Sequence, residues 1–79
     1  MQPYKNLSGQ SGVIAYEIGE DFIDVKFRER SKDGCDTYKY SYFRPGSQHV
    51  EQMKRLALIG LGLNSYINKN VRKLYESKH

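Results

Sequence analysis

The period of the hydrophobic pattern changes once along this chain, at Pro45. Before Pro45, apolar and polar residues alternate in steps of two, which is typical of half-buried antiparallel strands. After it, apolar residues recur every three or four positions, which is typical of amphipathic helices. Because both patterns share only 79 residues, they must build one domain around one small core. The sequence therefore predicts an α+β fold with the strands first and the helices second.

Three strands are expected before Pro45. They span residues 12–18, 21–30 and 36–43, and the turns Gly19-Glu20 and Asp33-Gly34 separate them. In the second strand Ile23, Val25 and Phe27 share a face, which we expect to be the covered one. An Asp-Gly pair tolerates two positive φ angles, so Asp33-Gly34 predicts a type I′ hairpin. Such short links favour a three-stranded antiparallel meander.

Two helices are expected after Pro45. Ser47 is a good N-cap for a helix from Gln48, and Gly60-Leu61-Gly62 ends this helix. A second helix begins near Asn64. The expected apolar stripes are Val50, Met53, Ala57 and Leu61 in the first helix, and Leu63, Ile67, Val71 and Leu74 in the second. Both stripes need a cover, so we expect a β-β-β-α-α fold with the helices packed on the Ile23, Val25 and Phe27 face.

The chain ends carry no periodic pattern. We expect residues 1–11 to be a loose lead-in, residues 12–76 to form the domain and residues 77–79 to be a tail. The opening residues lack the apolar stretch of a signal peptide. The longest apolar run, 56–63, is too short to cross a membrane, which takes about 20 residues. We therefore expect a cytoplasmic protein without a membrane partner.

The net charge of +4 is concentrated in the second half of the chain. Residues 1–45 hold seven basic and seven acidic side chains, whereas residues 46–79 hold six basic and two acidic ones. Such asymmetry suggests a polyanionic partner, with RNA favoured over duplex DNA. The basic candidates for phosphate contacts are Lys54, Arg55, Lys69, Arg72 and Lys73. The alternative is that these side chains form a solvated helix surface.

Tyr38, Tyr40 and Tyr42 alternate along the third strand. Aromatic rings at this spacing can stack nucleobases. The candidate pair is either Tyr38 and Tyr40 or Tyr40 and Tyr42, and proximity to Phe43 and Pro45 favours the second pair. The alternative is that the tyrosine face covers the core, with each hydroxyl reaching solvent or a partner.

The third strand and the closing segment together resemble a known family. The matching residues are the run Tyr38-Lys39-Tyr40-Ser41-Tyr42-Phe43 and the segment 62–75, in which a Gly, a Tyr-x-Asn step and a basic residue precede a final aromatic residue. They resemble the KTSC domain, which is named for the C-terminal extension of some lysyl-tRNA synthetases and also occurs as small stand-alone proteins. The resemblance covers about residues 11–76 and implies RNA binding. The chain departs from the family at Arg44-Pro45-Gly46, where a valine–proline pair is usual.

The remaining features favour a binding module over an enzyme. Cys35 and His49 lack a third orienting residue, so a nucleophile pair is not expected. The acidic residues show no metal-ligand spacing, and no glycine-rich phosphate loop follows a strand, so we expect no metal, cofactor or small-molecule substrate. Leu58 and Ile59 lie beside the core stripe of their helix and provide the rival hypothesis. In that hypothesis the chain docks on a protein or forms a homodimer, through this apolar patch or a free sheet edge.

Overall fold

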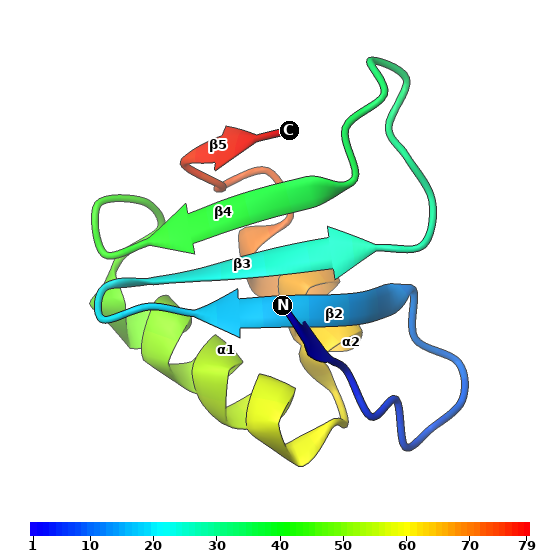
Figure 1. Cartoon of the computed structure of the whole chain (residues 1–79). Coiled ribbons are helices and arrows are strands. Elements are labelled where there is room, and N and C mark those ends of the chain that lie inside the picture. Colours follow the sequence, from blue (N-terminus) through cyan, green and yellow to red (C-terminus); the bar gives the residue numbers. More distant parts are fainter.

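One antiparallel sheet carries two helices and a π-helical turn on one of its faces (Figure 1). The computed structural model describes all residues, 1–79. Its elements are β1 (Gln2–Pro3), β2 (Val13–Ile18), β3 (Phe22–Phe27), β4 (Thr37–Ser41), α1 (Ser47–Ile59), α2 (Leu63–Tyr66), the π-helical turn η1 (Ile67–Val71) and β5 (Ser77–Lys78). The predicted α+β class, with an antiparallel sheet and two helices, is confirmed.

The sheet has five strands in the order β1-β2-β3-β4-β5, so the prediction of three strands is wrong. The two additional strands come from the segments that were expected to be loose. Gln2 and Pro3 pair with β2, and the next residue, Tyr4, is buried and accepts a hydrogen bond from the Leu63 amide at 3.3 Å. At the other edge β5 pairs with β4, and the His79 amide donates to the Thr37 carbonyl at 2.8 Å. Both ends thus satisfy backbone groups at the edges of the meander.

A β-bulge alters the expected faces of β2. The register with β3 shifts between Val13 and Ala15, so one extra residue enters this strand. Because a bulge inverts the alternation of side chains, Val13 and Tyr16 both point into the core while Ile14 is exposed. Strict alternation would place Ile14, Tyr16 and Ile18 on one face of the strand, but of the three only Tyr16 is buried.

The central strands follow the expected pattern more closely. Ile23 and Val25 are fully buried, and Phe27 packs partly against the core, which confirms the covered face of β3. The link from β3 to β4 is longer than a two-residue hairpin. Gly34 has a φ of 82°, but Asp33 does not share the positive φ that a type I′ turn requires, so that prediction is wrong.

The helices bury the predicted stripes up to their last member. Val50, Met53 and Ala57 of α1 are buried, as are Leu63, Ile67 and Val71 after it. Leu61 is exposed because α1 ends before it, and Leu74 is exposed because the chain leaves the helical path after η1 to form β5. The first cap differs from expectation as well, because Gly46 and not Ser47 stands at the N-cap of α1. Gly62 stands at the N-cap of α2, which begins at Leu63, close to the expected start near Asn64.

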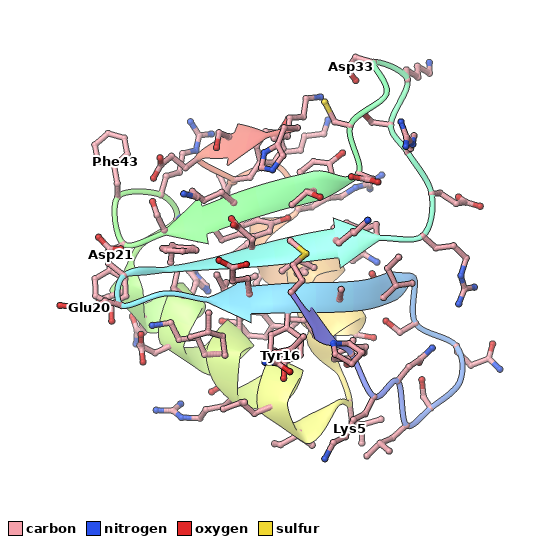
Figure 2. The ribbon with its side chains drawn as sticks, viewed as in Figure 1. Lys5, Tyr16, Glu20, Asp21, Asp33 and Phe43 are labelled. Carbon is pink, nitrogen blue, oxygen red and sulfur yellow. The ribbon has the colours of Figure 1, made fainter.

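The residue that ends α1 allows a sharp stability test. Gly60 has a φ of 83°. Lys5 lies beside this end of α1 (Figure 2), and a Cβ built on Gly60 would lie 2.5 Å from the Cβ of Lys5. We expect Gly60→Ala to cost about 1–2 kcal/mol for the left-handed backbone, and more for the overlap. Gly34→Ala is the matched control, because φ there is 82° with nothing within 4 Å. Thermal melts should show a clearly larger fall in Tm for Gly60→Ala, and equal falls would contradict the close approach.

Candidate functional site

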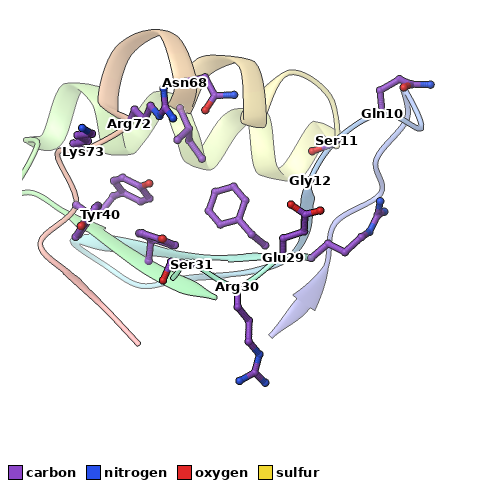
Figure 3. A pocket seen from close by; sticks show the side chains of 15 residues that line it. Gln10, Ser11, Gly12, Glu29, Arg30, Ser31, Tyr40, Asn68, Arg72 and Lys73 are labelled. Atoms are coloured by element: carbon purple, nitrogen blue, oxygen red, sulfur yellow. The ribbon is translucent and has the colours of Figure 1, made fainter. Parts of the chain in front are cut away.

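A hollow of about 650 Å³ opens between the sheet and η1, beside the loop that follows β3 (Figure 3). Residues distant in the sequence line it because β3, β4, η1 and the segment before β2 converge there. They include Gln10, Ser11, Gly12, Phe27, Arg28, Glu29, Arg30, Ser31, Tyr38, Tyr40, Ile67, Asn68, Arg72, Lys73 and Tyr75. One side is fastened by a backbone hydrogen bond of 2.8 Å from the Arg28 amide to the Gly12 carbonyl.

Aromatic rings form the apolar part of this hollow. Phe27 and Tyr38 meet edge to face with ring centroids 5.5 Å apart, and Tyr38 meets Tyr75 in the same way at 4.9 Å. These three rings are only partly buried, so each keeps accessible surface. Tyr40 also lines the hollow, although it is only 1% exposed. The result is an aromatic floor whose members hold one another in place.

Cationic side chains dominate the rim of the hollow. Arg28 and Arg30 come from the loop after β3, and Arg72 and Lys73 follow η1. Glu29 is the only acidic residue among the lining side chains, so the site carries an excess of positive charge. In Figure 3 the guanidinium of Arg30 points away from the hollow, which leaves the other three cations as the candidates for contact with a bound anion.

The fold brings together only part of the set of candidate residues. Arg72, Lys73 and Tyr40 share the hollow, whereas Lys69 is exposed outside its lining. Tyr40 has no ring face free for stacking, because its side chain is buried among core residues. The remaining candidates, Lys54, Arg55 and Tyr42, lie on or beside α1, away from the hollow. The basic candidates therefore do not form one continuous surface.

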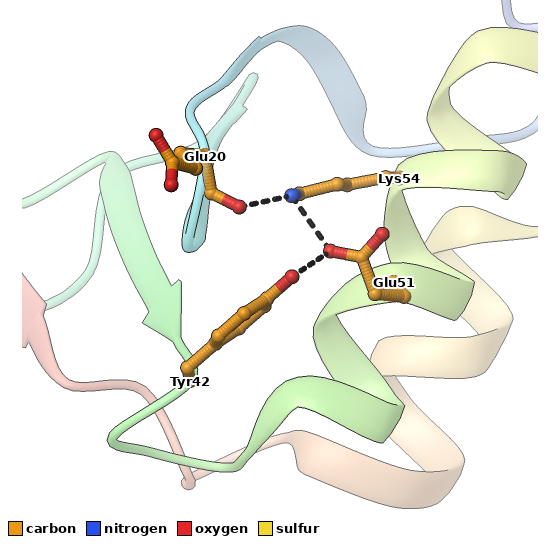
Figure 4. A network of polar contacts seen from close by, with 4 residues as sticks. All are labelled: Glu20, Tyr42, Glu51 and Lys54. Atoms are coloured by element: carbon orange, nitrogen blue, oxygen red, sulfur yellow. Dashed lines mark hydrogen bonds and ion pairs between the residues drawn. The ribbon is translucent and has the colours of Figure 1, made fainter.

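Lys54 and Tyr42 belong to a polar network that fastens α1 to the strand ends (Figure 4). The Lys54 ammonium lies 2.7 Å from the Glu51 carboxylate and donates to the Glu20 carbonyl at 2.9 Å. The Tyr42 hydroxyl donates to the same carboxylate at 2.5 Å. The hydrogen bond from Lys54 lowers the pKa of Glu51, and the bond to Glu51 raises the pKa of Tyr42. These polar groups are engaged within the chain.

Sequence reasoning did not propose Arg28 or Tyr75 as site residues. It assigned Phe27 to the covered face only and favoured Tyr40 and Tyr42 over Tyr38. The expected strand 21–30 is longer than β3, which ends at Phe27, and this earlier end places Arg28 in the loop at the end of the sheet. Tyr75 stands out in the sequence only as the final aromatic residue of the segment that resembles the KTSC domain. Its place depends on β5, which returns along β4 and holds this ring against Tyr38.

An ion pair holds this returning segment. Lys78 lies 3.0 Å from Asp33, and its ammonium sits 5.8 Å from the centroid of the Tyr75 ring. The hydrogen bond from Lys78 lowers the pKa of Asp33 to about 2. Because this pKa lies below the unfolded value of about 3.9, the stabilising effect is complete above about pH 4 and is lost as pH falls through 2.

We therefore expect the Asp33 carboxyl to titrate with a midpoint near 2 in the folded protein. Carbon-13 NMR of the side-chain carboxyl against pH measures this midpoint. In Lys78→Met the midpoint should rise toward the ordinary value of about 3.9, because the main donor is gone. An unchanged midpoint in Lys78→Met would show that Lys78 does not hold Asp33 in solution.

The other candidate groups lie apart from the hollow. Cys35 lies in the β3–β4 loop, while His49 lies on α1 with its Nδ1 2.7 Å from the Tyr66 hydroxyl. No three His, Cys, Asp or Glu side chains come together as a metal site would need. None of the helices has both the length and the apolar character needed to span a bilayer. Comparison with protein-family models, curated proteins and solved structures found no match.

Proposed function

We propose that this chain is a small, non-enzymatic, cytoplasmic module that binds single-stranded RNA in the hollow between the sheet and η1. The observation that carries the proposal is the combination of an aromatic floor, formed by Phe27, Tyr38 and Tyr75, with cations at the rim. The resemblance to the KTSC domain supports the same ligand.

The two parts of the hollow suit the two parts of a nucleotide. Partly exposed rings offer contact surface to an unpaired base, and base–aromatic stacking contributes about 1–3 kcal/mol per base. Arg28, Arg72 and Lys73 provide charge for the adjoining phosphates. Asn68 and Ser11 at the same hollow offer hydrogen-bonding groups to base edges or to a ribose 2′-hydroxyl. A duplex keeps its bases stacked inside the helix, so this arrangement favours single strands.

The rival mode of docking at a free sheet edge receives less support. β1 and β5 cover parts of the outer edges of β2 and β4, and each of these strands is only two residues long. Pro3 also lacks the N–H that an added strand would need at this edge. Short edge strands and proline are devices that disfavour strand addition.

Fluorescence anisotropy with labelled RNA tests the proposal. A single-stranded oligouridine, an RNA hairpin and a duplex DNA are titrated at several salt concentrations from 50 to 200 mM. We expect the single strand to bind most tightly. With three phosphate contacts, log K should fall with log salt at a slope of about −2. Absence of binding to every probe at 50 mM salt, with protein at tens of micromolar, would refute the proposal.

A further inference from the structure

Exposed apolar side chains gather where β1 and β2 meet the second half of α1. Leu58 is 61% exposed, Ile59 and Met1 are each 54% exposed, and Ile18 is 37% exposed. Met1, Ile18 and Leu58 line a second hollow of about 550 Å³. Ile59 follows Leu58 on α1. These four residues are called the apolar patch here.

The apolar patch continues past the end of α1. The Leu7 amide donates to the Gly60 carbonyl at 2.8 Å, which places Leu7 beside the turn that carries Leu61. Both leucines are largely exposed, at 63% and 47%. Single exposed apolar residues are ordinary on a protein surface, but six of them on adjoining elements mark an interaction site.

A two-fold interface would bury this surface against a copy of itself. The second hollow is lined by Leu58 of α1 and by Ile18 of β2, and Ile59, the next residue of α1, is exposed as well. Because a two-fold interface joins the same patch on both subunits, the exposed apolar side chains of one copy would meet those of the other.

The charges around the apolar patch point to the same occupant. Glu17 lines the second hollow, Arg55 lies one helical turn before Leu58 and Ile59, and Lys5 lies beside Gly60. Acidic and basic groups are therefore both present at this rim, whereas the rim of the first hollow is mainly basic. A rim of mixed sign can pair with itself, while a rim of one sign requires a partner of opposite charge.

We infer that a second copy of this chain covers the apolar patch and forms a two-fold symmetric homodimer. The two hollows share no lining residue, so the dimer keeps both RNA sites open. The inference does not depend on RNA binding, because it rests on a different surface and is tested without nucleic acid.

Sedimentation equilibrium of the full chain up to hundreds of micromolar tests this inference. We expect the wild type to reach twice the monomer mass. Leu58→Gln/Ile59→Gln should raise the dimer dissociation constant about tenfold or more, since two exposed apolar side chains lose their buried contacts. Ile18→Gln, on a different element of the same patch, should weaken the dimer as well.

The matched control is Phe43→Gln. Phe43 is 88% exposed and lies on the loop between β4 and α1, far from Lys5 in Figure 2. This control should remain a dimer, and circular dichroism should show that all variants stay folded. The inference is overturned by a wild type that stays monomeric, or by a dimer that survives both patch variants.

Discussion

Tyr40→Ala is expected to unfold most of the protein at room temperature. Tyr40 is 1% exposed, is among the largest fully buried side chains, and belongs to the core cluster that residues of the sheet and the helices form together. Truncating a buried aromatic ring costs about 3–5 kcal/mol, and a domain of this size has little more than that to lose. Urea unfolding followed by circular dichroism measures the loss.

Tyr40→Phe is the control for this prediction. No side-chain hydrogen bond of the chain involves the Tyr40 hydroxyl, and burial raises the pKa of this group above its ordinary value. Removing the hydroxyl while keeping the ring should therefore leave the free energy of unfolding within about 1 kcal/mol of the wild type. A Tyr40→Ala variant that melts within a few degrees of the wild type would show that the ring is not a core residue.

Arg72→Ala/Lys73→Ala is expected to weaken RNA binding strongly and to reduce its salt dependence. Both side chains lie at the rim of the first hollow, and their loss removes two of the three expected phosphate contacts. The slope of log K against log salt should fall in magnitude by about 1.4 on single strands. Affinity should fall for every RNA sequence alike, because phosphate contacts position the nucleic acid without specifying its bases. The salt series of anisotropy titrations measures both quantities.

Arg55→Ala/Lys69→Ala is the matched control for charge. It removes the same formal charge from two exposed side chains that do not line the hollow. We expect its slope to stay near that of the wild type. If both double variants lose the same slope, general attraction to a basic protein explains the binding, and the hollow has no special part in it.

The sequence predicted the elements whose side-chain pattern is local and regular. Alternation over residues 21–30 identified β3 and its covered face, and helical spacing identified the buried stripe of α1. The two edge strands carry no such pattern, because a strand of two residues is defined by the neighbour it pairs with. The bulge in β2 was equally inaccessible, since one extra residue changes the faces without changing the composition.

The candidate site was only partly predictable for a related reason. Charge asymmetry pointed to Arg72 and Lys73, which line the hollow, but it also included Lys54, whose ammonium is engaged by Glu51. Arg28 belongs to the half of the chain in which basic and acidic residues are equal in number, so the net charge of that half did not indicate a basic site there. Tyr75 joins the aromatic floor because the chain leaves its helical path after η1 and returns along β4.

Amide chemical-shift mapping of the labelled protein during titration with a single-stranded oligouridine tests directly whether the first hollow binds RNA. We expect shifts that concentrate on the lining of the first hollow, at residues 10–12, 27–31, 38, 40, 67, 68, 72, 73 and 75. The amide chemical shifts of Arg55 and Leu58, which lie on α1 and do not line the hollow, should stay unchanged. Shifts centred on α1, or no shifts at saturating RNA, would contradict the claim that the hollow is the RNA site.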